Sequence, residues 1–501
     1  MLVGVLVAAT SLLPLGFVVV ETLKLGGQEA HDLLFRQRVA DLLWNTTRLL
    51  VGGVALSVVI GVLCAWLVVR TDLPWAGLWH GVLCAPLAVP AFVNGYGWVS
   101  TTHAVQSYPG AVLVVSLSYY PLVYLPTVAA LRRLDSAVED VAASLGTGAW
   151  SSFGRVVLPA ISPAVLGGAL LVGLHLLGEY GALQLLNYPT LTTAILDQYR
   201  IAFNGPAATL LALVLVAFCL VLLALELLAR GHRRRSRLGS GVAVTATRHR
   251  LGRTTPLWLA GLAGFAALTL GVPLTSLARW LLHGSSSSLP RGDLAGALGT
   301  TLGLAVAGGL LATAAALPVA WLAVRYRGVL ATLVERAVYP ANALPGIVVA
   351  LALVTISIRV VPSVYQTLPL LVLGYVILFL PRAVVGVRST LELAPPVLDE
   401  VATSLGCTRT GAARRVTLPL VLPGLGAGLA LVALAVGTEL TATLLLAPIG
   451  TSTLATEFWS RASQVAYGAA APYALCLILI SVPATWLLGR AALRSDPRRL
   501  G

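Results

Sequence analysis

The chain has 501 residues, of which 58% are hydrophobic and only 10% are charged. Soluble domains carry about a quarter charged residues, so this composition excludes an ordinary soluble protein. Apolar runs of about 18 or more residues recur along the chain, and each can cross the roughly 30 Å core of a bilayer. These runs are continuous and lack the alternation of a membrane β-barrel. The sequence therefore predicts an all-α polytopic membrane protein.

The formal net charge of +14 arises from basic residues that lie between the apolar runs. They gather at Arg132, Arg133 and Arg155, at 230–253, at Arg409, Arg414 and Arg415, and at 490–499. This placement is the positive-inside bias that orients membrane helices. We therefore expect the lipid bilayer as a partner and no nucleic acid. The same bias places both termini on the cytoplasmic side of the inner (plasma) membrane.

Hydropathy predicts about 12 membrane spans, six in each half of the chain. In the first half they lie near 2–22, 43–69, 79–100, 110–131, 161–187 and 207–229. In the second half they lie near 256–280, 295–324, 334–358, 367–388, 420–447 and 470–490. An arginine-rich segment at 230–255 separates a first domain, 1–229, from a second, 256–501, and we expect it to be a cytoplasmic linker.

One short polar pattern occurs twice, near 133–160 and near 390–420. The first copy reads D-V-A-A-S-L-G, nine residues, then V-V-L-P; the second reads E-V-A-T-S-L-G, nine residues, then V-T-L-P. Gly146 corresponds to Gly406, an offset of 260 residues, and Pro121, Pro163 and Glu179 recur at the same offset. Six spans per half in the same orientation indicate two parallel repeats related by a pseudo-two-fold axis.

Each copy of the pattern predicts a short cytoplasmic helix that another protein can grip. The residues are Glu139, Asp140, Ala142, Ala143 and Gly146 in the first copy, and Asp399, Glu400, Ala402, Thr403 and Gly406 in the second. Acids near a helix N-terminus are favourable by roughly 0.3–1 kcal/mol. The small residues would leave a low surface, and the glycine can end the helix with a positive φ.

The pattern resembles the E-A-A loop of ATP-binding cassette (ABC) importer permeases, E-A-A-x3-G-x9-I-x-L-P. Both copies depart slightly, since Val141 or Val401 follows the acid and Val156 or Val416 replaces isoleucine. The resemblance implies two fused type I permease halves, two copies of a cytoplasmic ATPase on the loops, and an extracytoplasmic binding protein. ATP and Mg²⁺ would then bind the partner subunits, and this chain would bind no cofactor.

The chain itself lacks the residues of a motor. A phosphate-binding G-x-x-x-x-G-K-[ST] loop needs a lysine, and the one lysine here, Lys24, follows Leu23. No H-E-x-x-H or G-x-S-x-G motif occurs either, so we expect no catalytic residues. An ion-gradient-driven secondary transporter, or a membrane scaffold or enzyme, are rival interpretations. Both leave the repeated cytoplasmic loop unexplained.

Two stretches narrow the family. Residues 178–195, G-E-Y-G-A-L-Q-L-L-N-Y-P-T-L-T-T-A-I, and residues 438–459 resemble the two halves of ferric-iron importer permeases. Thiamine permeases share this fused layout, and a polyamine or an inorganic anion are further alternatives for the cargo. The resemblance thus implies ferric iron as the first expectation for the substrate.

Charged residues inside the membrane are functional candidates, because burying a charge there is costly. Glu179 and Glu439 each lie 20 residues after their Leu-Pro proline, so both fall in the outer half of the bilayer. We expect them to contact Fe³⁺ transiently on the translocation pathway, with His175 and Tyr180 as further pathway candidates. The alternative is that each glutamate only hydrogen-bonds between helices and stabilises the bundle.

Overall fold

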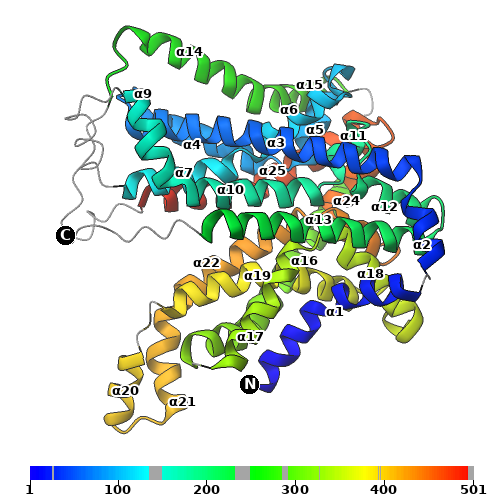
Figure 1. Ribbon diagram of the computed structural model, residues 1–501, viewed down its shortest axis with the longest axis vertical. Helices are drawn as coiled ribbons and strands as arrows, with labels where there is room; N and C mark the ends of the chain where they lie inside the picture. Colours follow the sequence, from blue (N-terminus) through cyan, green and yellow to red (C-terminus); the bar gives the residue numbers. More distant parts are fainter. Residues whose placement is uncertain are drawn as a thin grey trace. The chain divides into compact units, whose positions relative to one another are not determined.

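The computed structural model describes residues 1–24, 27–134, 149–231, 249–284, 291–326, 328–392, 394 and 396–494. Every regular element in these ranges is a helix, apart from one isolated β-bridge between Thr71 and His249. Nine of the described helices are long and apolar enough to cross a membrane, or up to 12 when each of three bent pairs counts as one span. The predicted all-α polytopic fold is confirmed (Figure 1).

The chain forms two compact units. The first comprises Met1–Ala40, Leu191–Leu220 and Ser288–Ile480. Its helices are α1 (Leu2–Lys24), α2 (Gly27–Leu34), α12 (Leu191–Arg200), the first part of α13 (Gly205–Gly231), α16 (Arg291–Arg325), α17 (Val329–Val338), α18 (Gly346–Val360), α19 (Leu368–Glu392), α20 (Pro396–Ser404), α21 (Arg409–Ala412), α22 (Leu418–Gly437), α23 (Thr441–Leu446), α24 (Leu454–Ala462) and the first half of α25 (Tyr467–Arg494). Helices α16, α19 and α22 pack on one another and form its centre.

The second unit comprises Asp41–Thr190, Val221–Ser287 and Ser481–Gly501. Its helices are α3 (Gln37–Arg70), α4 (Ala76–Cys84), α5 (Ala91–Val99), α6 (Tyr108–Tyr119), α7 (Pro121–Arg133), α9 (Ala149–Ser152), α10 (Leu158–Gly178), α11 (Gly181–Leu185), α14 (Thr255–Ala266) and α15 (Val272–His283). Its core includes the fully buried rings of Tyr120 and Tyr124. The ring of Phe265, on α14, meets Tyr120 edge-on at 5.0 Å.

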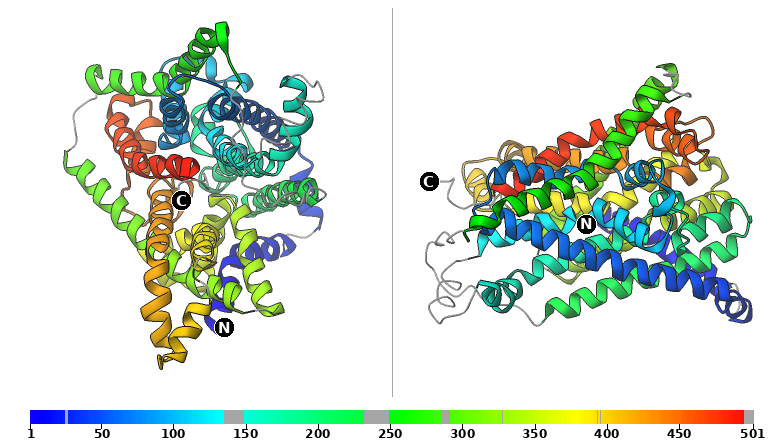
Figure 2. Two further views of the ribbon diagram at one scale, coloured as in Figure 1. Left: turned by 90° about the vertical axis from the view of Figure 1, so that its left-hand side faces the viewer. Right: turned by 90° about the horizontal axis from the view of Figure 1, so that it is seen from above.

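The helices that open each half of the sequence belong to the compact unit formed mainly by the other half. Helix α1 opens the chain, yet it packs against α16, α17 and α18 of the second half (Figures 1 and 2). Conversely, α14 and α15 open the second half and pack against α4 and α5 of the first half. At one such contact, a Cβ added to Gly97 on α5 would lie 2.6 Å from the Cα of Pro273 on α15. This exchange could not be predicted from hydropathy, which identifies an apolar helix but not the helices that it packs against.

Two predicted spans, 79–100 and 334–358, are broken where the sequence analysis took them as continuous. The helical segments on either side bend by 90° before Ala91 and by 102° before Gly346. Pro90 and Pro345 are the N-cap residues of α5 and α18, and both have extended ψ values. A proline lacks the N–H that would continue the preceding helix, but it starts a new helix well. The sequence repeat therefore corresponds to a repeat in backbone geometry.

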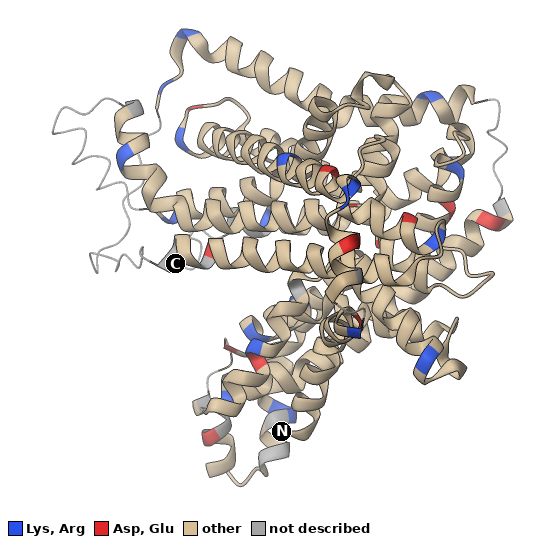
Figure 3. Ribbon diagram, turned by 45° about the vertical axis from the view of Figure 1, so that its right-hand side comes forward, with Lys and Arg blue, Asp and Glu red and all other residues tan. Residues whose placement is uncertain are grey.

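Charged residues are sparse along the long helices (Figure 3). Several of those within helices are paired in the first unit. Glu21, near the end of α1, forms ion pairs with Lys24 and with Arg359 on α18. Arg388 on α19 likewise pairs with Glu335 and Glu392. Such pairing lowers the cost of placing charges near an apolar environment.

Candidate functional site

The second copy of the repeated pattern forms helix α20 and the turn that follows it. Gly406 has φ +87°, a left-handed conformation that disfavours any residue with a Cβ. Its N–H donates to the Thr403 carbonyl at 3.1 Å, and the Cys407 N–H donates to the Ala402 carbonyl at 3.0 Å. These two bonds form a Schellman motif, the hydrogen-bond pattern that ends a helix at a glycine. The predicted helix-ending role of Gly406 is confirmed.

Helix α20 has an exposed apolar face, which was not predicted from the sequence. Ala402 is buried, so it does not form the low outer surface expected of it, although Thr403 is exposed. The exposed side chains include Val397, Val401 and Leu405, which are 59%, 50% and 79% exposed. Their spacing of four residues places them on one face of the helix, and this i, i+4, i+8 pattern could have revealed them.

The acids of this copy lie in the N-terminal half of α20. The helix begins at Pro396, so Asp399 is its fourth residue and Glu400, which is exposed, is its fifth. The first copy, with Glu139, Asp140, Ala142, Ala143 and Gly146, lies outside the described residues. The docking role of both copies stays a prediction.

A π-helical turn follows the docking segment in both halves. It spans Phe153–Val157 in one half and Ala413–Thr417 in the other, again 260 residues apart. In the first half the Leu158 N–H bonds to the Phe153 carbonyl, five residues back. Pro159 follows and cannot donate to the carbonyl four residues back, so a wider turn fits this position. The two turns connect the docking segments to the long helices α10 and α22.

Tryptophan and arginine side chains at the ends of α3 and α16 hold the bases of the docking segments. Trp66 packs edge-on against Phe153 at 6.2 Å and stacks on His249 at 6.0 Å. His249 also donates its N–H to the Arg70 carbonyl at 2.8 Å, so the described end of the linker is fixed there. In the second half, Arg325 donates to the carbonyl of Ala394, just before α20, at 3.2 Å.

Glu179 lies at the end of α10, where the predicted span 161–187 is interrupted. Its ψ is 119°, so the helix ends at Gly178. One carboxylate oxygen accepts a hydrogen bond from the Ala182 N–H at 2.8 Å, at the start of α11. The other oxygen accepts a short hydrogen bond from the hydroxyl of Tyr119, at the end of α6. The half-buried carboxylate therefore both caps a helix and meets a phenol.

Glu439 follows α22 at the corresponding position, in a different environment. It accepts a hydrogen bond from the Ala442 N–H at 3.0 Å and so caps α23 as Glu179 caps α11. A Cβ added to Gly346, the first residue of α18, would lie 2.9 Å from its Oε1 atom. The guanidinium of Arg382, on α19, interacts electrostatically with this carboxylate.

The other two predicted pathway residues differ in position. The ring of His175 packs against that of Tyr119 at 5.4 Å, and its Nδ1 lies 2.8 Å from the Leu171 carbonyl. Tyr180 is only 5% exposed and is the N-cap residue of α11. Tyr119, which the sequence analysis did not select, is the residue that joins His175 to Glu179. Within the described residues, no three His, Cys, Asp or Glu side chains gather closely enough to hold a metal ion.

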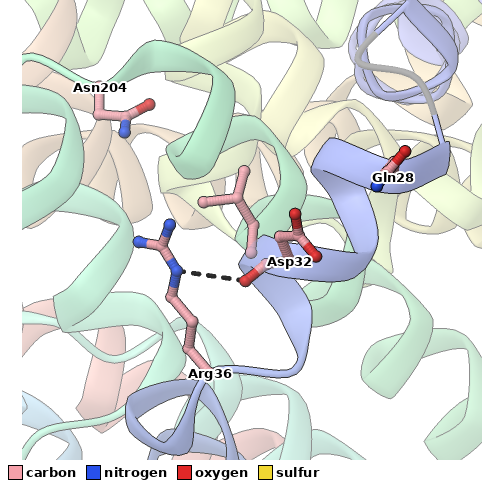
Figure 4. Close-up of a pocket in the computed structure, with 5 residues that line it drawn as sticks. Gln28, Asp32, Arg36 and Asn204 are labelled. Atoms are coloured by element: carbon pink, nitrogen blue, oxygen red, sulfur yellow. Dashed lines mark hydrogen bonds between the residues drawn. The ribbon is translucent and has the colours of Figure 1, made fainter.

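A polar pocket of about 470 Å³ lies away from all of these residues, in the first unit. Gln28, Asp32, Leu33, Arg36 and Asn204 line it, from α2, the turn between α2 and α3, and the segment before α13 (Figure 4). The Nε atom of Arg36 donates to the Asp32 carbonyl at 3.2 Å, and Asn204 caps α13 through the Ala207 N–H. These polar groups serve local structure, and no predicted site residue contributes to the pocket.

Comparison with known proteins shows that the same protein family matches both halves of the chain. The sequence profile described as "Binding-protein-dependent transport system inner membrane component" matches residues 57–234 and again residues 293–495. The Fe(3+)-transport system permease protein FbpB 2 of Haemophilus influenzae is 36% identical over 497 residues, which cover 98% of this chain and 97% of that protein.

More distant relatives match about half of this chain or less. The sulfate transport system permease protein CysW of Escherichia coli K12 is 29% identical over 43% of this chain and 82% of its own length. The molybdenum transport system permease protein ModB of the same organism is 30% identical over 37% of this chain and 90% of its own length. Both therefore resemble a portion of this chain no larger than one of its halves.

Proposed function

Because the chain belongs to the family of binding-protein-dependent transport system inner membrane components, we propose that it carries ferric iron inward as the permease of an ABC importer. The observation that carries the substrate assignment is the 36% identity to a ferric-iron permease along 98% of the chain, both halves included. The chain is a multi-pass inner-membrane transporter subunit and not an enzyme. ATP hydrolysis would occur on separate subunits.

Two copies of a cytoplasmic ATPase would bind the two docking segments. The apolar stripe of Val397, Val401 and Leu405, with the exposed acid Glu400 beside it, suits an interface that buries apolar area and keeps a charged rim. The Schellman turn at Gly406 and the anchor of Arg325 on Ala394 would make α20 a firm lever. ATP and Mg²⁺ would bind those subunits, and this chain would bind no cofactor.

An extracytoplasmic binding protein would deliver the iron, with both termini and the linker of this chain in the cytoplasm. The basic residues of 230–255 and 490–499 support that orientation. ATP binding would draw the two docking segments together, and the π turns would pass this movement to α10 and α22. Glu179 directly follows α10 and Glu439 lies two residues after the end of α22, so movement of these helices would shift both carboxylates.

Transport assays with matched substrates test this proposal. The chain would be expressed, together with the proposed ATPase and binding protein, in cells that lack their own ferric-iron uptake. We expect uptake of ⁵⁵Fe³⁺ that vanadate abolishes, and no uptake of labelled thiamine, sulfate or molybdate. Vanadate-resistant uptake would indicate a gradient-driven carrier instead. Uptake of thiamine or an oxyanion without uptake of iron would reassign the substrate and keep the ABC importer class.

A further inference from the structure

We propose that Tyr119 and Glu179 together are the iron-contacting pair of this chain, and that Glu439 is a structural carboxylate. This inference rests on the proposed transport of ferric iron and selects between the two glutamates. It also adds a ligand that the sequence pattern did not indicate, since 60 residues separate Tyr119 from Glu179.

The Tyr119–Glu179 pair places two oxygen atoms that can bind a metal ion next to each other. The phenol donates to one carboxylate oxygen, while the Ala182 N–H occupies the other at 2.8 Å. Both side chains are partly exposed within otherwise apolar helices, as is that of His175, whose ring packs against Tyr119. Ionisable side chains in membrane-spanning segments almost always face the interior of the helix bundle or a water-filled cavity, and not the lipid. Phenolate and carboxylate oxygens are hard donors, which suit a hard cation such as Fe³⁺.

The corresponding place in the second half has no phenol at the matching position, although Glu439 is partly exposed as Glu179 is. Phe379 stands 260 residues after Tyr119, so no phenol can reach Glu439 from that position. Arg382 lies one turn further along α19, and its positive charge interacts with Glu439. A cation next to a carboxylate reduces the attraction of that carboxylate for a second cation.

Packing also restricts Glu439. Its Oε1 atom occupies the space that a Cβ of Gly346 would fill, and the same oxygen caps α23 through Ala442. A second link runs from the Thr443 hydroxyl to the Glu439 carbonyl at 2.7 Å, and Tyr375 bonds to that hydroxyl. The carboxylate therefore joins the start of α18 to the start of α23, which is a structural task.

Binding of iron at Tyr119 requires its phenol to lose a proton. A ferric ion in neutral water carries hydroxide ligands, and one of these can accept the proton. The Tyr119 O–H bond breaks, an iron–phenolate bond forms, and the hydroxide leaves as water. Glu179 loses the hydrogen bond from Tyr119 and gains the iron instead, so no oxidant or reductant is needed.

A visible-light titration of the purified chain tests the pair. Ferric nitrilotriacetate would be added to the chain in lipid nanodiscs, and the phenolate-to-iron charge-transfer band would be recorded. We expect a band in the wild type that is absent in Tyr119→Phe. The apparent iron affinity should fall by more than about 10-fold in Glu179→Gln, since loss of an outer-shell partner alone costs about 10–100-fold. Tyr375→Phe removes a buried phenol and should keep the band, as should Glu439→Gln. Thermal unfolding of each variant checks that it is folded.

Uptake of ⁵⁵Fe³⁺ in cells separates the possible outcomes. If the wild type takes up iron but shows no band, or if Tyr119→Phe keeps the band or wild-type uptake, the pair is overturned while the proposed function stands. A band that disappears in Glu439→Gln and persists in Glu179→Gln would reverse the assignment of the two carboxylates and overturn the inference. If the wild type takes up no iron, the proposed function itself fails.

Discussion

Gly168 sets how closely α10 approaches α7, and its replacement by alanine is the sharpest test of the packing. A Cβ at this position would lie 2.6 Å from the Cα of Val123 and 2.8 Å from the carbonyl oxygen of Leu122. Backbone atoms cannot rotate away as side chains do. Ordinary contact begins near 3.4 Å, so the two helices must separate by about 0.8 Å, the difference between 3.4 Å and 2.6 Å.

The expected cost follows from two opposing contributions. Overpacking a well-packed contact costs about 1–3 kcal/mol. Alanine is favoured over glycine inside a helix by about 0.5–1 kcal/mol, which offsets part of that cost. The second half offers a matched control, because Gly428 occupies the corresponding position of α22 and an added Cβ there meets nothing within 4 Å. We therefore expect Gly168→Ala to be about 1–3 kcal/mol less stable than Gly428→Ala.

The assay is unfolding of the purified chain in mixed micelles with rising dodecyl sulfate, followed by the fluorescence of its 11 tryptophans. Iron uptake should fall in Gly168→Ala as well, because α10 ends next to Glu179 and its displacement moves the carboxylate away from Tyr119. Equal unfolding midpoints for Gly168→Ala and Gly428→Ala would refute the close approach of α10 and α7.

Two further predictions concern the docking turn and the partly buried ion pair between Glu457 and Arg461. Gly406→Ala and Gly450→Ala should each lower the free energy of unfolding by roughly 1–2 kcal/mol, since both glycines have φ near +85°. Only Gly406→Ala should reduce co-purification of the ATPase. An equal reduction in Gly450→Ala would count against docking at the turn of Gly406. Burial raises the pKa of Glu457, but hydrogen bonds from Ser452 and Arg461 and the charge of Arg461 outweigh it, so the pKa lies below its usual value. The wild type should therefore lose stability as the pH falls through that pKa, whereas Glu457→Gln should lose less stability over the same pH range. Thermal unfolding recorded at a series of pH values measures both.

The class of fold and the repeat could be predicted from the sequence because hydropathy and spacing are local signals. The apolar runs predicted the membrane helices. The offset of 260 residues between the two halves also relates the two π turns found in the structure. The breaks at Pro90 and Pro345 were visible as prolines, but an apolar window averages across them. Their near-perpendicular bends depend on the helices packed around them.

The environments of the two glutamates could not be predicted, since they depend on contacts between distant segments. Tyr119 and Glu179 are 60 residues apart, and no periodicity relates them. The inward position of Ala402 is a matter of helix phase: a shift of one residue turns a side chain by about 100°, from one face of the helix towards another. The exposed side chains of Val397, Val401 and Leu405 show one apolar face of α20 that is available to a partner.

Fusion of the two halves in one chain makes their chemical differences possible. A permease built from two identical subunits presents every side chain twice, on both sides of its symmetry axis. In this chain Tyr119 is matched by Phe379, and Leu122 is matched by Arg382, although both carboxylates are kept. One half can thus hold a phenol against its glutamate while the other holds a cation against its own. The conserved carboxylate position serves helix capping in both halves, and the changed neighbours decide whether it can also meet a cation.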